Sequence, residues 1–178
     1  MNNLSNVEFI LLTLINEKKK ISGYELNVLI QERHFRDWAD IGTTSIYIGL
    51  KKLKNKNFVN SHFDHNKMGK GPISTKFSIS GSGISHLRKE ALEALSESKS
   101  NDIRFDLAIS TMDIFPAATI LNAILKRKKM LCQDKIALQE KIKNNQDFKK
   151  HEVIIFNHAL SFIESEISFL DSLSNKIN

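Results

Sequence analysis

Apolar residues recur at helical spacing along most of the chain. The first apolar stripe, within residues 7–14, follows Ser5-Asn6-Val7-Glu8, which fits a capping box in which a serine and a glutamate bond each other's backbone amides. A second capping box, Ser22-Gly23-Tyr24-Glu25, precedes another apolar stripe. The pattern therefore predicts one helix that begins at Ser5 and a second that begins at Ser22 and runs towards Arg33.

A third helix is expected to open at Thr43, Thr44 or Ser45, any of which could cap it, and to run to about Asn57. Three apolar residues of this helix, at intervals of four and three positions, would face the core; they are Ile46, Leu50 and Leu53. The residues left on other faces are Tyr47, Ile48, Lys51, Lys52, Lys54 and Asn55. The outward side of this helix thus presents hydroxyl, amide and ammonium groups, which suit base edges and phosphates.

A β-ribbon should follow the third helix. Residues 58–63 have mixed alternation, and residues 75–79 alternate polar and apolar side chains with strict period two. The connector 64–74 contains two glycines, a proline and two lysines, so it predicts a basic tip. Ser80 or Ser82 can then cap a fourth helix.

The second half of the chain predicts a short helix after residue 101, a long helix over about 116–143 and a last helix over about 147–174. The last helix carries an apolar seam in steps of three and four, as in a coiled coil. The seam consists of Val153, Phe156, Leu160, Ile163, Ile167 and Leu170. Beside it lies a second stripe of Ile155, Ala159, Phe162, Phe169 and Leu173. One stripe can pack on the preceding helix, whereas two favour a further partner, for which a second copy of the chain is the economical choice.

Glycine and proline are scarce, with 7 Gly and 2 Pro in 178 residues, and seven of these nine lie between positions 42 and 83. This distribution disfavours an all-β fold. We expect a mainly α protein with a small β-ribbon, divided into domains at 1–98 and 99–178. No stretch approaches the roughly 20 apolar residues of a membrane span, and the single cysteine indicates a reducing, cytoplasmic location.

Positive charge is concentrated in the same region. The chain has a net charge of +6, and residues 43–76 alone contain seven lysines against one acid, Asp64. Such a local excess would attract a polyanion such as DNA. A solvated, lysine-rich surface explains the charge equally well by itself, so the arrangement of the elements has to decide.

Three helices followed by a two-stranded ribbon are the order of a winged helix-turn-helix, in which the third helix enters the major groove. The chain resembles the PadR family of transcriptional regulators through Gly23-Tyr24-Glu25-Leu26 in helix two and the segment Ile46-Tyr47-Ile48-Gly49-Leu50-Lys51-Lys52-Leu53 in helix three. Phe58-Val59 also matches the apolar pair that opens the family's wing. The chain departs from the pattern at Ile48, where a proline is usual, and at Ser74-Thr75, where an Arg-Lys pair is common.

The resemblance implies a homodimeric repressor that binds double-stranded DNA at a near-palindromic operator. The candidate DNA-binding residues are Thr43, Thr44, Ser45, Tyr47, Ile48, Lys51, Lys52, Lys67, Lys70 and Lys76, and the candidate dimerisation residues are those of the first seam, Val153 to Leu170. Some similar regulators respond to phenolic acids or bind planar drugs, so Trp38 and Phe35 either cover the core or stack on a small aromatic effector. The alternative hypothesis is a winged-helix-derived module that binds proteins or sequesters a ligand without binding DNA.

Other chemistry has little support in the sequence. The six histidines lack metal-ligand spacing, and the motifs of a nucleophile elbow, a phosphate-binding loop and a zinc protease are not present. We therefore expect no enzyme activity, no metal and no cofactor. The basic run 126–129 spans most of a helix circumference and is interpreted as solvated surface, with a phosphate contact as the alternative.

Overall fold

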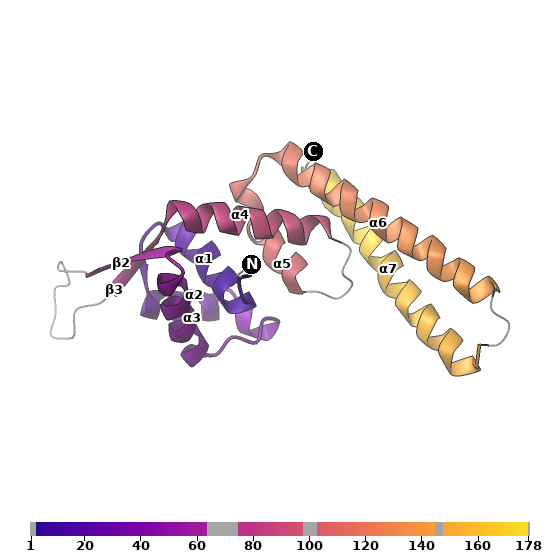
Figure 1. Ribbon diagram of the computed structural model, residues 1–178, viewed down its shortest axis with the longest axis horizontal. Helices are drawn as coiled ribbons and strands as arrows, with labels where there is room; N and C mark the ends of the chain where they lie inside the picture. Colours follow the sequence, from indigo (N-terminus) through magenta and orange to yellow (C-terminus); the bar gives the residue numbers. More distant parts are fainter. Residues whose placement is uncertain (1–2, 64–74, 98–102, 145–147, 178) are drawn as a thin grey trace. The chain divides into compact units, whose positions relative to one another are not determined.

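The computed structural model describes residues 3–63, 75–97, 103–144 and 148–177 (Figure 1). Its elements, in chain order, are α1 (Asn6–Lys18), β1 (Ile21–Ser22), α2 (Gly23–Glu32), the 3₁₀ turn η1 (Phe35–Asp37), α3 (Thr43–Asn55), β2 (Val59–Phe63), β3 (Thr75–Ile79), α4 (Gly81–Ser96), α5 (Ile103–Ile109), the 3₁₀ turn η2 (Met112–Ile114), α6 (Ala117–Asn144) and α7 (Lys150–Ile177). The order confirms a mainly α fold that starts with a winged helix-turn-helix.

Both predicted capping boxes are confirmed. The Ser5 hydroxyl accepts the Glu8 amide at 3.3 Å, and the Glu8 carboxylate accepts the Ser5 amide at 2.7 Å. The same reciprocal bonds join Ser22 and Glu25 at 3.2 and 2.7 Å. Each box satisfies two of the backbone donors that a helix N-terminus leaves unpaired, which explains why α1 and α2 begin at these positions.

The start of α3 corrects the sequence-based expectation. Its N-cap is Gly42, which supplies no side chain, and none of the three expected hydroxyl residues caps the helix. The Ser45 hydroxyl instead donates to the Gly42 carbonyl at 2.6 Å. The helix ends before Asn57, whose φ of 58° is left-handed. Asparagine tolerates this conformation better than most residues do, so it is a suitable stop.

The sheet has three antiparallel strands in the order β1-β3-β2. The predicted ribbon is confirmed, with Val59 opposite Ile79 and Phe63 opposite Thr75. The two-residue strand β1 adds to it by pairing Ile21 with Phe77. A strand this short has no readable alternation, and the sequence pattern therefore did not predict it.

The wing and α4 meet in a tight turn. The Ser80 hydroxyl accepts the Gly83 amide at 3.0 Å, which confirms Ser80 as a cap of α4. A Cβ at Gly83 would lie only 2.2 Å from the Phe58 carbonyl oxygen, so no other residue fits without moving the backbone. Glu90, further along α4, accepts the Leu4 amide at 2.7 Å and thereby ties the N-terminal segment to this helix.

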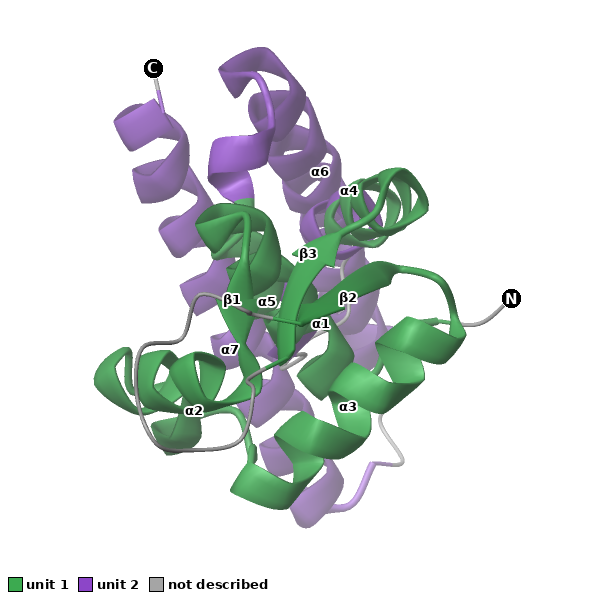
Figure 2. Ribbon diagram, turned by 90° about the vertical axis from the view of Figure 1, so that its left-hand side faces the viewer, with its two compact units in different colours: residues 1–91, 106–111 green, residues 92–105, 112–178 purple. Residues whose placement is uncertain are grey.

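The chain divides into two compact units, residues 1–91 with 106–111 and residues 92–105 with 112–178 (Figure 2). The expected boundary at residues 98 and 99 lies outside the described residues. In the first unit, side chains from α1, α2 and α3 form a core in which Phe9, Leu26, Ile46 and Leu53 have no solvent exposure. This core fixes the orientation of α3.

The second unit is dominated by the antiparallel pair α6 and α7, which pack along their length (Figure 1). Both lie close to the predicted ranges. Among the described residues, α7 is the one helix that is long and apolar enough to cross a membrane by length and composition, and little of it is buried. That property corrects the expectation that no segment approaches a membrane span.

Candidate DNA-binding surface

The outward face of α3 is exposed as predicted. The core side carries Ile46, Leu50 and Leu53, all at most 2% exposed. The exposed residues of the helix, here called the recognition face, are Thr43, Thr44, Tyr47, Ile48, Lys51, Lys52, Lys54 and Asn55. This face contains three lysines and no acid, and its uncharged members offer hydroxyl, amide and apolar groups. It has the chemistry of a surface that meets phosphates and base edges.

Two glycines allow α3 to lie close to its neighbours. A Cβ at Gly49 would lie 2.7 Å from the Leu11 side chain of α1, and one at Gly23 would lie 2.8 Å from the Tyr47 ring. The Tyr47 ring therefore covers the start of α2 while remaining 51% exposed. These contacts hold the recognition face against both preceding helices.

Hydrogen bonds from a neighbouring turn hold the N-terminal end of α3. Arg36 donates to the Asn27 side-chain oxygen at 2.7 Å and to the Thr43 hydroxyl at 3.2 Å, and that hydroxyl donates to Asn27 at 3.2 Å. Thr43 and Ser45 thus both use their hydroxyls within the chain. Thr43 and Ser45 therefore help to position the first turn of α3, whereas Thr44 is exposed on its outward side.

A buried carboxylate holds the C-terminal end of α3. The Lys56 ammonium lies 2.8 Å from Glu8 Oε1, and the side chain of Glu8 is only 3% exposed. Burial alone raises the pKa of Glu8, but hydrogen bonds from Lys56 and Ser5 and the positive charge of Lys56 outweigh it. The pKa of Glu8 therefore lies below its ordinary value of 4.5. Sequence reasoning found the capping role of Glu8 and missed this second role, because Lys56 is far away along the chain.

The wing is described only at its base. Lys76 is half-buried in β3, and His62 lies 3.1 Å from the Ser78 hydroxyl across the ribbon. Phe63, at the end of β2, is 68% exposed. Lys67 and Lys70, the expected phosphate contacts of the tip, lie outside the described residues.

The candidate effector residues lie next to each other. Phe35 is 6% exposed and belongs to the core, whereas Trp38 is 43% exposed. Their ring centroids are 5.2 Å apart with a tilt of 38°. The Phe35 ring thus lies against the indole, and part of the Trp38 ring is exposed to solvent.

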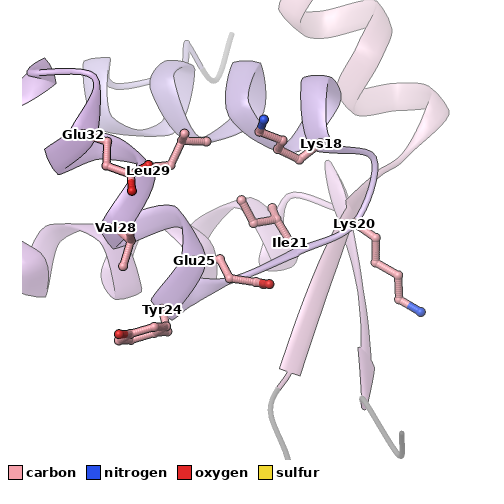
Figure 3. Close-up of a pocket in the computed structure, with 8 residues that line it drawn as sticks. All are labelled: Lys18, Lys20, Ile21, Tyr24, Glu25, Val28, Leu29 and Glu32. Carbon is pink, nitrogen blue, oxygen red and sulfur yellow. The ribbon is translucent and has the colours of Figure 1, made fainter. Parts of the chain in front are cut away.

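A separate cavity of about 410 Å³ lies between the end of α1, β1 and α2 (Figure 3). Ile21, Val28 and Leu29 provide its apolar lining. The polar residues around it are Lys18, Lys20, Tyr24, Glu25 and Glu32. Charges of both signs lie around this wide opening, so it has no clear preference for an anionic or a cationic ligand. No pattern in the sequence predicts this cavity, because its lining residues come from three elements.

In the second unit, Lys126 and Lys129 of the basic run are exposed, whereas Arg127 and Lys128 correct the interpretation of the run as solvated surface or phosphate contact. Arg127 is 2% exposed and binds the Glu166 carboxylate of α7 at 2.5 Å. It also donates to the Ala94 and Glu97 carbonyls, and its guanidinium lies 4.1 Å from the centre of the Phe105 ring. Lys128 pairs with Asp171, and further along α6 Lys135 pairs with Glu164 at 2.8 Å. Three basic residues of α6 therefore bind acids of α7.

The two apolar stripes of α7 differ in exposure. Members of the first seam are half-buried, and Leu170 is completely covered by its own chain. In the second stripe, Ile155, Phe162 and Phe169 are 60%, 48% and 47% exposed. These three residues follow one another at intervals of seven, which places them on one line of the helix. We call them the exposed stripe.

No protein-family profile matches the sequence, and no curated protein matches it. Solved structures, in contrast, do match this chain. Bacillus subtilis PadR in complex with operator DNA is 16% identical, with 98% of this chain and 100% of that chain covered and a TM-score of 0.46. The structural neighbours of this chain across nearly its full length are PadR family transcriptional regulators. Bacillus subtilis PadR in complex with p-coumaric acid is 18% identical, with 96% and 98% covered and a TM-score of 0.41.

A PadR-like regulator from Bacillus cereus is 15% identical, with 97% of this chain and 98% of that chain covered and a TM-score of 0.40. At this level of identity and structural similarity, the comparison transfers no residue role to this chain. Within the described part of this chain, no group of three histidine, cysteine, aspartate or glutamate side chains could hold a metal ion.

The position of Glu8 generates a prediction about stability and pH. Glu8→Gln removes the charge that binds Lys56, and we expect the free energy of unfolding at pH 7 to fall by roughly 1.5–3 kcal/mol. Because the pKa of Glu8 is lowered in the folded state, its contribution is complete above about pH 4.5 and is lost as the pH falls through the lowered value. Urea denaturation at several pH values should show the difference between wild type and variant shrinking towards acid.

Glu17→Gln is the matched control. Glu17 also binds a cation, Arg33 at 2.6 Å, but both side chains are about two-fifths exposed, so this pair should contribute at most about 1 kcal/mol. A difference for Glu8→Gln that stays constant from pH 7 to pH 3 would contradict the role of the ion pair.

Proposed function

We propose that the chain is a sequence-specific DNA-binding transcriptional regulator, a cytoplasmic repressor that acts as a homodimer on a near-palindromic operator. The observation that carries the proposal is the recognition face of α3. It exposes three lysines with no acid, and it is held at its N-terminal end by Arg36 and at its C-terminal end by Glu8. A cationic helix face on a rigid winged-helix frame suits the major groove.

The lysines and the uncharged residues have different roles in this proposal. Lys51, Lys52 and, at the wing, Lys76 neutralise phosphates, as do Lys67 and Lys70 of the tip. Thr44 and Tyr47 lie where they can contact base edges or sugar-phosphate oxygens. Thr43 and Ser45 contribute by fixing the first turn of α3, because their hydroxyls already bind within the chain.

The homodimer is proposed from the second unit. The exposed stripe consists of three large apolar side chains that no described residue covers fully. A second copy of α7 can bury them, whereas a bilayer is a poor partner because Glu164 and Glu166 in the same helix bind Lys135 and Arg127. Burying three such side chains from each copy would contribute on the order of 9–18 kcal/mol before the cost of association. This interface differs from the one expected from the sequence, because the first seam, from Val153 to Leu170, is half-buried or buried within its own chain and is less available to a second copy.

A small aromatic effector completes the proposal. One similar protein, Bacillus subtilis PadR, has been solved with p-coumaric acid. In this chain, the partly exposed Trp38 ring, supported by Phe35, offers a flat apolar surface on which an aromatic acid can stack. Binding would change DNA affinity only to the extent that the ligand prefers one arrangement of the dimer over another.

The DNA-binding prediction is tested by selection from random duplexes followed by titration at several salt concentrations. We expect an enriched inverted repeat and a log–log salt dependence with a slope of about −0.9 per neutralised phosphate. Lys51→Ala should weaken binding to all sequences and reduce the slope by about 0.9 per half-site. Lys129→Ala removes an equal charge from an exposed site on α6 and should leave binding unchanged. No sequence preference at about 150 mM salt would favour the module without DNA binding.

The dimer prediction concerns the middle of the exposed stripe. Phe162→Glu places a charge where the two copies would meet, and light scattering coupled to size-exclusion chromatography should then report a monomer. Asn157→Glu introduces the same charge on the opposite side of α7 and should leave the dimer intact. A wild-type chain that is monomeric at micromolar concentration, or a Phe162→Glu variant that remains dimeric, would contradict the proposed interface.

The effector prediction uses the fact that Trp38 is the single tryptophan of the chain. Titration with p-coumaric acid should quench its fluorescence with saturation, and the same ligand should release the selected DNA. Phe35→Leu leaves the fluorophore in place but removes the ring that supports it, so it should weaken the saturable quenching. Quenching that rises linearly with ligand concentration, as for free tryptophan, would contradict stacking on Trp38.

A further inference from the structure

An isoleucine occupies the middle of the recognition face. Ile48 is 50% exposed, and Thr44 lies one turn before it on the same line of α3. Lys51 and Lys52 follow one turn later, and both are exposed. Ile48 is thus an exposed apolar side chain with polar residues before and after it on the outward side of α3.

The fold does not require isoleucine at this position. The buried contacts of α3 come from Ile46, Leu50 and Leu53, which are at most 2% exposed. A β-branched residue on an exposed helix surface is also a poorer helix former than alanine, lysine or glutamine. The packing of α3 therefore does not explain Ile48.

The surroundings of Ile48 indicate what kind of partner it meets. Lys51 and Lys52 are close along the helix, so a second copy of α3 would bring like charges together around any apolar contact. A polyanion such as DNA would instead be attracted to these lysines. In the major groove of DNA, the apolar group that a base presents is the 5-methyl group of thymine.

We propose that Ile48 reads the 5-methyl group of one thymine in each half-site and is thereby a specificity-determining residue. The inference rests on the DNA-binding function proposed above. The side chain cannot form hydrogen bonds, so it would leave the amino or carbonyl edge of another base unpaired and dehydrated. It therefore favours thymine both by contact with the methyl group and by excluding bases that need a polar partner.

The experiment combines a change in the protein with a change in the DNA. An operator is first selected from random duplexes with the wild-type protein, and each thymine is then replaced in turn by deoxyuridine, which lacks only the methyl group. At one position in each half-site we expect the replacement to weaken wild-type binding about fourfold, the value of one buried methyl group. Ile48→Ala should bind the thymine and deoxyuridine duplexes equally.

Two comparisons isolate the contact. Ile48→Ala replaces an exposed residue with a better helix former, so it should fold normally, and it should leave the salt slope unchanged because it removes no charge. Lys52→Ala should weaken binding on every duplex and reduce the slope, while it keeps the difference between thymine and deoxyuridine. Circular dichroism and light scattering verify that both variants keep the fold and the oligomeric state.

The possible outcomes separate the two proposals. If the wild-type protein selects no sequence, the DNA-binding function itself fails. If the wild-type protein selects an operator but no deoxyuridine replacement interacts with Ile48→Ala, the function stands and the thymine contact is wrong. A thymine preference that Ile48→Ala keeps in full also overturns the assignment and moves the contact to another residue of the face.

Discussion

The first unit depends most on the interactions of the Glu8 carboxylate. One of its oxygens accepts the Ser5 amide and closes the N-terminus of α1, and the other binds the ammonium of Lys56 just beyond the end of α3. The group is almost completely buried, so its negative charge is tolerated only because both partners are present. The helices α1 and α3, which β1 and α2 separate along the chain, therefore share one electrostatic contact. Removal of Lys56 would leave a buried negative charge without its counter-ion.

Arg127 plays a comparable part in the second unit with the charges reversed. Its buried guanidinium binds one carboxylate, donates hydrogen bonds to two backbone carbonyls and lies against one aromatic ring. Ion pairs of this kind contribute little net stability compared with apolar residues of similar size, but loss of one partner is costly because it leaves a buried charge unpaired. A further ion pair between Lys135 and Glu164 joins α6 and α7 at another point along their length. The register of α6 against α7 is thus set by charge as well as by apolar packing.

Local signals explain which parts of the fold could be predicted from the sequence. The two capping boxes and the alternation in β3 depend on residues within a few positions of each other, and both were confirmed. The strand β1, the burial of Arg127 and the bond between Glu8 and Lys56 depend on residues far apart in sequence, and these were missed. Gly42 was missed for another reason, because a glycine N-cap leaves no side-chain signal and three hydroxyl residues followed it directly.

The turn between the wing and α4 has a mechanical consequence. The hydroxyls of Ser80 and Ser82 both donate to the Asn57 carbonyl, at 2.7 and 2.9 Å, and the Ser80 amide donates to the Phe58 carbonyl at 2.9 Å. The first residues of α4 are therefore hydrogen-bonded to the segment where α3 ends, and Gly83 packs directly against the Phe58 carbonyl. A displacement of the start of α4 is therefore expected to move the end of α3 with it. Because α4 leads out of the first unit, its position and that of the last turn of α3 are coupled through these hydrogen bonds.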